Sequence, residues 1–84
     1  MADTFQIDIA TPEKLLLQQT AESAQIPGKD GYMGILPGHA ALLSELGAGT
    51  LSVTSGGQTQ NFTITGGYVE VRDNHLRVLV DRVE

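Results

Sequence analysis

Only a few side chains in this sequence have the chemistry of a catalyst or a metal ligand. His39 and His75 are the two imidazoles, and the chain has no cysteine. Histidine is both a common general base and a common metal ligand. A zinc site needs three or four converging ligands, whereas these two histidines lie on separate predicted turns with no helical pairing. The spacing therefore predicts no metal site, and we expect no cofactor.

The hydroxyl groups and glycine loops also form no recognisable catalytic set. Ser44, Ser52 and Ser55 lack the Gly-x-Ser-x-Gly context of a serine hydrolase nucleophile. The stretch Gly28-Lys29-Asp30 is similar to part of a phosphate-binding loop, but it lacks the earlier glycine and the following Ser or Thr that such a loop requires. We therefore expect a surface turn at residues 28–30, no catalytic residue and no enzymatic activity.

The composition limits the classes of partner. A chain of 84 residues can bury one small core, so we expect a single domain over residues 1–84. Its net charge of −5 disfavours nucleic acid and anionic lipid as partners. The first residues do not resemble a secretory signal or a transit peptide, and no apolar run approaches the roughly 20 residues that span a bilayer. We expect a soluble domain on the cytosolic side of a membrane or free in the cytosol.

The elements that would position any functional residue are strands. Apolar residues alternate with polar ones in residues 5–9, 51–53, 62–64, 68–72 and 76–80, which is the period of half-buried strands. Residues 55–58 and 73–75 lie between such runs and have the composition of hairpin turns. Residues 13–26 contain helix-forming residues, but the strong β pattern elsewhere favours two strand pieces with a kink between them. At least six strands in so short a chain predict an all-β sandwich or barrel.

Glycines mark the expected corners. Gly66 and Gly67 lie between two predicted strands with no room for a loop, so we expect a bulge or a sharp bend there. Gly31 and Gly34 flank Tyr32-Met33 in another predicted strand, which indicates close approach by a second backbone.

The stretch PGHAALLSEL (residues 37–46) has two interpretations. In one, a tight turn is followed by an apolar segment that plugs one end of the sandwich, because leucines such as Leu42, Leu43 and Leu46 are typical core residues. In the other, Pro37, Gly38 and His39 form an exposed loop tip that contacts a partner. Both interpretations can hold together.

Three blocks of the chain, in order, resemble the N-terminal β-sandwich domain of the epsilon subunit of F-type rotary ATP synthases. IPGKDGYMGILPGHAALLSEL (residues 26–46) is similar to the family's signature around its Gly-His pair. ITGGYVEVRDNHLRVLVD (residues 64–81) is similar to its Gly-Gly strand run, and the match of the opening FQIDIATPEKLLL (residues 5–17) is weaker. Together these blocks cover nearly the whole chain.

The resemblance implies a fold and a role. The fold would be a flattened sandwich or barrel of roughly ten short, mostly antiparallel strands, in line with the strand pattern. The role would be that of a non-catalytic rotor subunit in the central stalk, coupling the gamma subunit to the membrane c-ring during proton-driven ATP synthesis. The expected location is peripheral, on the cytoplasmic face of the bacterial inner membrane, with the stroma-facing thylakoid membrane as the alternative. The isolated domain is expected to be a monomer that inserts into no lipid.

The resemblance also implies which residues contact other subunits. The c-ring contact of the family corresponds to residues 31–39, so the candidate contact residues are Gly31, Tyr32, Met33, Gly34, Pro37, Gly38 and His39. His39 would be a structural residue at or near this contact, and Gly66 and Gly67 would be structural glycines.

This sequence departs from the family pattern in three ways. Ala41 stands where the family usually has proline, and Tyr32 where it often has a polar or acidic residue. The pair of C-terminal helices that the family usually carries is expected to be absent, so the chain as given should not bind ATP or inhibit hydrolysis through helices. The competing hypothesis is a generic β-sandwich module that binds a ligand or a protein, although only Phe5, Tyr32, Phe62 and Tyr68 are aromatic.

Overall fold

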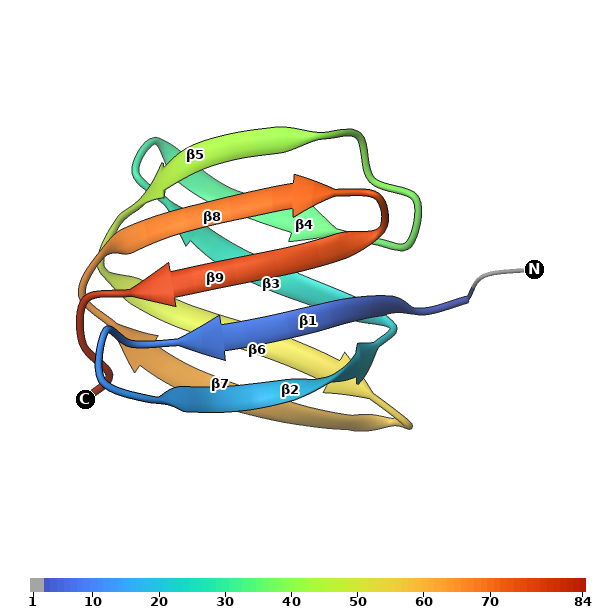
Figure 1. Ribbon diagram of the computed structural model, residues 1–84, viewed down its shortest axis with the longest axis horizontal. Helices are drawn as coiled ribbons and strands as arrows, with labels where there is room; N and C mark the ends of the chain where they lie inside the picture. Colours follow the sequence, from blue (N-terminus) through green and yellow to red (C-terminus); the bar gives the residue numbers. More distant parts are fainter. Residues whose placement is uncertain (1–2) are drawn as a thin grey trace.

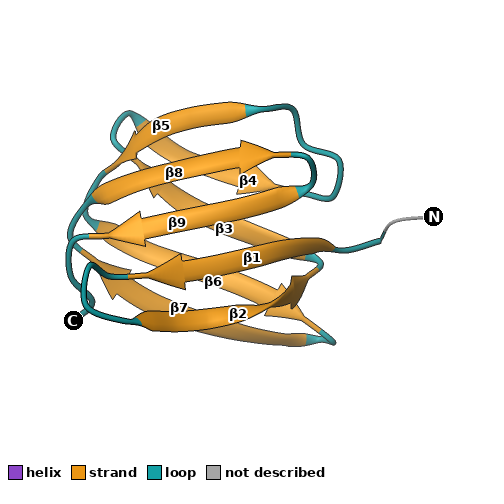
Figure 2. Ribbon diagram, viewed as in Figure 1, coloured by secondary structure: helices purple, strands orange, loops and turns teal. Residues whose placement is uncertain are grey.

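The computed structural model describes residues 3–84 and consists of nine β-strands, which Figure 1 shows in chain order. The strands are β1 (Phe5–Ala10), β2 (Leu15–Ala21), β3 (Ser23–Gly28), β4 (Gly31–Ile35), β5 (Leu42–Leu46), β6 (Gly49–Ser55), β7 (Gln58–Ile64), β8 (Gly67–Arg72) and β9 (His75–Val80). The described residues contain no helix (Figure 2), and therefore none that could cross a membrane. The all-β prediction is confirmed.

One continuous sheet curls into two layers. The strand order is β2-β1-β9-β8-β5-β3-β6-β7, with β4 added beside β3. In Figure 1, β5, β8, β9, β1 and β2 form the front layer, and β4, β3, β6 and β7 form the back layer. All pairs are antiparallel except β1 with β9. The predicted flattened sandwich of mostly antiparallel strands is therefore confirmed.

The core lies between the two layers and follows from the period-two pattern. In β1 the side chains of Phe5, Ile7 and Ile9 are buried while their neighbours are half-buried. Val69 and Val71 in β8 are buried in the same way, and Tyr68 points outward. Each fully buried aliphatic side chain contributes roughly 1.5–3 kcal/mol relative to exposure. Burial on alternate positions explains why these segments form strands.

Two tight hairpins form at the predicted turns. Gly56 and Gly57 join β6 to β7 with φ angles of 58° and 78°. Asp73 and Asn74 join β8 to β9 with φ angles of 53° and 60°. Positive φ at both central residues gives a turn whose twist matches that of the flanking strands. Asp and Asn tolerate this conformation better than other non-glycine residues.

The segment of ambiguous pattern, residues 13–26, is divided between two strands as predicted. β2 belongs to the front layer and β3 to the back layer, and only Glu22 separates them. The backbone N–H of Glu22 donates to the carbonyl of Thr54 at 2.8 Å. This bond fixes the kink where the chain crosses between the layers.

The interpretation of residues 42–46 as an apolar plug is wrong for Leu43 and holds for Leu42 and Leu46. These residues form β5, which pairs with β8 along its length. Leu46 is buried in the core and the half-buried Leu42 packs against it, whereas 75% of Leu43 is exposed. Strand geometry explains the difference, because consecutive side chains point to opposite faces and three leucines cannot all enter the same core.

Candidate functional site

The seven candidate contact residues do not form one loop. Gly31, Tyr32, Met33 and Gly34 belong to strand β4, whose hairpin with β3 turns at Lys29 and Asp30. Pro37, Gly38 and His39 lie in the connection that leads from the other end of β4 to β5 (Figure 1). Since a strand rises about 3.3 Å per residue, Gly31 at the start of β4 lies roughly 13 Å from the end of the strand at Ile35, whereas Gly34 is only three residues from Pro37.

Tyr32 is held against the back layer although 55% of it is exposed. Its hydroxyl accepts a hydrogen bond of 3.0 Å from the backbone N–H of Thr50 in β6. A Cβ atom on Gly49 would lie 2.5 Å from this hydroxyl and 2.9 Å from Cβ of Pro27. The Tyr32 side chain therefore lies across β3, where its bond to Thr50 holds it. Gly49 leaves the space that the hydroxyl occupies, since a side chain there would collide with it. The ring of Tyr32 presents a rigid aromatic surface.

The turn at Pro37-Gly38-His39 is closed by its own backbone. The N–H of His39 donates to the carbonyl of Leu36 at 3.1 Å, and Gly38 has a φ of 82°. The His39 ring is half-buried, and its Nδ1 lies 2.7 Å from the carbonyl oxygen of Ala40. Because a carbonyl only accepts, Nδ1 carries the hydrogen. His39 thus contributes to the turn, and Leu36 beside it is 61% exposed.

Asn74 is a positioning residue that the sequence analysis missed. Its Oδ1 accepts a 2.9 Å hydrogen bond from the N–H of Gly38, and its Nδ2 donates to the carbonyl of Thr4 at 2.9 Å. It thereby joins the β4–β5 turn, the β8–β9 turn and the start of β1. An asparagine at a turn was the only signal in the sequence, because the partners lie 36 and 70 residues away.

Gly66 and Gly67 form a sharp bend, one of the two predicted alternatives. Their φ angles are 147° and 134°, and the chain passes here from β7 in the back layer to β8 in the front layer. A Cβ on Gly67 would collide with the carbonyl oxygen of Leu79 and lie 2.8 Å from Cα of Val80. The register of β8 with β9 is regular, so this corner holds no bulge.

The expected backbone contact at Gly31 and Gly34 does not occur within the described chain. No heavy atom lies within 4 Å of the position of a Cβ at either residue. Gly31 has a φ of 135°, which favours glycine. Gly34 has no positive φ, so neither conformation nor space inside the chain requires glycine at this position.

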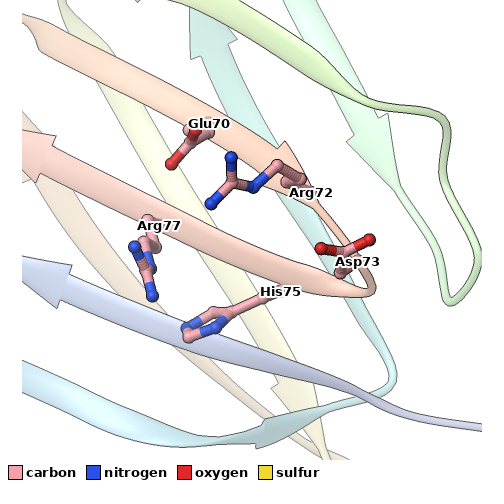
Figure 3. Close-up of a pocket in the computed structure, with 5 residues that line it drawn as sticks. All are labelled: Glu70, Arg72, Asp73, His75 and Arg77. Atoms are coloured by element: carbon pink, nitrogen blue, oxygen red, sulfur yellow. The ribbon is translucent and has the colours of Figure 1, made fainter.

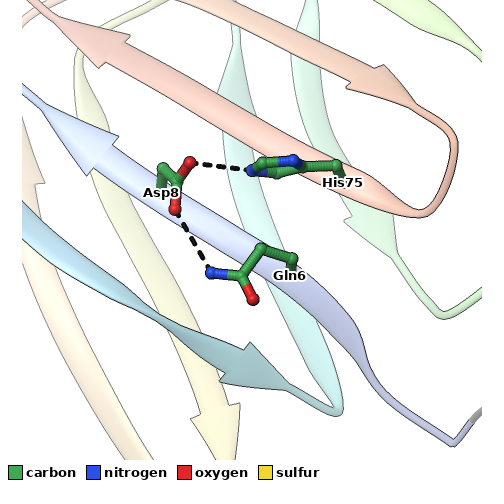
Figure 4. Close-up of polar contacts among 3 residues, drawn as sticks. All are labelled: Gln6, Asp8 and His75. Atoms are coloured by element: carbon green, nitrogen blue, oxygen red, sulfur yellow. Dashed lines mark hydrogen bonds and ion pairs between the residues drawn. The ribbon is translucent and has the colours of Figure 1, made fainter.

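His75, the second imidazole, forms a hydrogen bond with Asp8 across the parallel strands. Its Nε2 lies 2.8 Å from Oδ2 of Asp8, and the Gln6 amide donates to Oδ1 of Asp8 at 3.3 Å (Figure 4). Burial alone would raise the pKa of the Asp8 carboxyl, but the hydrogen bonds from His75 and Gln6 together lower it below its ordinary value. This pair links β1 to β9 on the outer face.

A shallow hollow of about 120 Å³ lies beside this pair. Figure 3 shows its lining residues on β8, β9 and the turn between them, which are Glu70, Arg72, Asp73, His75 and Arg77. The hollow is lined by both acidic and basic groups, and no serine, threonine or cysteine is among them. Within residues 3–84, no group of three or more potential ligands is arranged to hold a metal ion.

Comparison with known proteins agrees with this geometry. Solved structures with the same fold include a chain of the Euglena gracilis mitochondrial ATP synthase OSCP/F1/c-ring assembly, with a TM-score of 0.91, 23% identity and coverage of 100% of this chain and 54% of that one. A chain from the Tetrahymena thermophila mitochondrial ATP synthase central stalk/c-ring structure has a TM-score of 0.81 and 22% identity, covering 94% and 64%. These likenesses show that the chain has the same β-sandwich fold as those chains.

The sequence itself then defines the family. The family described as ATP synthase, Delta/Epsilon chain, beta-sandwich domain matches residues 4–84, and the chain belongs to it. The chain is 46% identical over all 84 residues to the ATP synthase epsilon chain of Koribacter versatilis, covering 59% of that relative. It is 44% identical to that of Solibacter usitatus, covering 63%. The chain thus spans about three fifths of the length of these relatives.

Proposed function

We propose that this domain is a central-stalk component of an F-type ATP synthase that links the gamma subunit to the c-ring. The observation that carries the proposal is the similarity to ATP synthase epsilon chains, which extends over the entire chain at up to 46% identity. The structure is compatible with a mechanical role, because a continuous sheet closed into two layers resists deformation along its strands. Torque can pass through such a body without any chemical step.

The proposed role includes no chemistry by this chain. The polar clusters at Asp8–His75 and in the hollow on β8 and β9 join structural elements and contain no serine, threonine or cysteine. The two groups of candidate contact residues, in β4 and in the turn at residues 37–39, serve as subunit contacts. The domain acts as part of the membrane-associated complex, on the cytoplasmic face of the bacterial inner membrane.

Co-expression with the gamma subunit of the same organism, followed by size-exclusion chromatography, tests the proposal. A one-to-one complex that survives the column is the expected result. Separate elution of two folded proteins would contradict the proposal for this chain. A melting-temperature screen with sugars and nucleotides is the complementary measurement, because only a ligand-binding module would be stabilised by them.

A further inference from the structure

The connection between β4 and β5, residues 36–41, is not held in place by hydrophobic packing. It carries Pro37, Gly38 and His39, one of the two groups of candidate contact residues. Within residues 3–84, none of its apolar side chains belongs to the hydrophobic core or packs against it, and 61% of Leu36 is exposed. The position of this loop relative to the sandwich therefore depends on hydrogen bonds.

Within the described chain, a single hydrogen bond joins this connection to another element. Two hydrogen bonds run inside the connection, from the N–H of His39 to the carbonyl of Leu36 and from its Nδ1 to the carbonyl of Ala40. The one that leaves it runs from the N–H of Gly38 to Oδ1 of Asn74, over 2.9 Å. Figure 1 shows the connection beside the β8–β9 turn, where Asn74 lies. The bond from Asn74 is thus a tether that holds the connection against the sandwich.

Asn74 is suited to this task because it is itself held at the start of β1. Its φ of 60° places it in the tight turn, and its carbonyl accepts a 3.1 Å hydrogen bond from the N–H of Gln6. Its Nδ2 donates to the carbonyl of Thr4 at 2.9 Å. Since β1 lies between β2 and β9 in the sheet, it is a firm support. The Asn74 amide therefore uses its acceptor for the connection and its donor for the sandwich.

An ordered contact loop binds a partner more tightly than a loose one. Ordering a loop on binding costs conformational entropy, and a loop that already has its bound position avoids that cost. Without the bond from Asn74, the connection would be held only at its two ends, by β4 and β5. The loss would then appear in the Kd for the partner and not only in the stability of the domain.

We propose that Asn74 is a positioning residue for assembly of the rotor. By holding Gly38, it keeps residues 36–41 in the arrangement in which Pro37, Gly38 and His39 meet the neighbouring subunit. It acts through the turn, so its role requires no contact with that subunit. This inference rests on the proposed function and deepens it, because it assigns a role in assembly to a residue outside both groups of candidate contacts.

Three substitutions separate positioning from stability. Asn74→Gly removes the side chain and allows the same positive φ. Asn74→Asp keeps an acceptor for the N–H of Gly38 and tolerates this φ, but a carboxylate cannot donate to the carbonyl of Thr4. Gly57→Ala is the control for stability, because a side chain is strained at its φ of 78° in the separate β6–β7 turn.

Two measurements are made on each protein. Hydrogen exchange at the amide of Gly38 in the free chain reports the tether itself. Thermophoresis with a labelled chain gives the Kd for a purified subcomplex of gamma and the c-ring. We expect Asn74→Gly to exchange this amide about tenfold faster and to raise the Kd about fivefold or more. Asn74→Asp and Gly57→Ala should stay within about twofold of the wild type in both measurements.

Three results would overturn the inference and leave the proposed function intact. Unchanged exchange at Gly38 in Asn74→Gly would show that the tether does not hold the turn. Faster exchange with a wild-type Kd would show that the position of the turn does not matter for binding. An equal rise of the Kd in Gly57→Ala would assign the effect to lost stability. If the wild-type chain does not bind the subcomplex, the proposed function fails and this inference falls with it.

Discussion

The side-chain oxygen of Asn74 lies 2.9 Å from the backbone nitrogen of Gly38, which precedes it by 36 residues. One side chain in the β8–β9 turn thus fixes the turn that carries His39. Through its Nδ2 it also holds the carbonyl of Thr4. The position of the candidate contact turn therefore depends on a residue outside it.

Replacing Asn74 should destabilise the fold in two separable steps. Asn74→Gly keeps the positive φ and loses both hydrogen bonds, and we expect a loss of about 1–2 kcal/mol. Asn74→Ala adds the strain of the left-handed conformation, for a total of about 2–3 kcal/mol. Urea denaturation measures both changes. Asp73→Gly, in the same turn, is the control, and wild-type stability in Asn74→Gly would show that these bonds contribute nothing.

The ring of Tyr32 and the missing side chain of Gly49 should be energetically coupled. Gly49→Ala is expected to cost about 2 kcal/mol, because the new methyl group meets the tyrosine hydroxyl and Pro27. The same change in a Tyr32→Ala background should cost clearly less. A double-mutant cycle in thermal denaturation measures the difference. Identical costs in both backgrounds would mean that the tyrosine does not occupy this position.

The bend at Gly67 should tolerate no side chain. Gly67→Ala is expected to cost at least about 3 kcal/mol, because its Cβ collides with the backbone of Leu79 and Val80. Gly57→Ala is the matched control, since it also has a positive φ but no atom within 4 Å, and it should cost about 1 kcal/mol. Differential scanning calorimetry measures the loss of stability in each variant. Equal losses of stability in Gly67→Ala and Gly57→Ala would show that backbone strain, and not the collision with Leu79 and Val80, causes the destabilisation.

The Asp8–His75 pair should make stability depend on pH on the acid side. The pKa of Asp8 is lower in the folded state than its ordinary value of 3.8, so its ionised form stabilises the fold above that pH. This contribution is lost as the pH falls through the folded pKa. Asp8→Asn should therefore be less stable than wild type at neutral pH and lose less stability on acidification. Urea midpoints from about pH 2 to 7 test this. If the urea midpoints of Asp8→Asn and the wild type change with pH in parallel, the Asp8–His75 pair is not the cause of the pH dependence.

His39 should matter more for assembly than for folding. His39→Ala removes a half-buried ring that, within residues 3–84, forms a hydrogen bond only with the adjacent Ala40. We therefore expect the stability of the isolated domain to change by no more than about 1 kcal/mol. Binding to the assembled rotor should weaken, as measured by reconstitution with gamma and the c-ring. A variant that fails to fold would identify His39 as a core residue instead.

Much of the fold follows from local pattern. The alternation of Phe5, Ile7 and Ile9, and of Val69 and Val71, predicts strands because one face must be buried. The turn residues Gly56-Gly57 and Asp73-Asn74 indicate their hairpins through backbone conformation alone. Gly66 and Gly67 predict a bulge or a sharp bend because they leave no room for a loop between two strands. The sequence wrongly suggests that Leu42, Leu43 and Leu46 are all core residues. Because side chains alternate between the two faces of a strand, Leu43 points away from the core.

The amino-acid sequence alone predicts the all-β class, most strand positions and the tight turns, and its motifs indicate the family. These properties depend on neighbouring residues, and a local pattern encodes them. The three-dimensional structure is needed to show that residues 31–39 divide into a strand and the turn that follows it, that Thr50 holds Tyr32, and that Asn74 holds Gly38. Each of these depends on which strands become neighbours when the sheet curls, because contacts between residues far apart in the chain arise from the packing of the whole core.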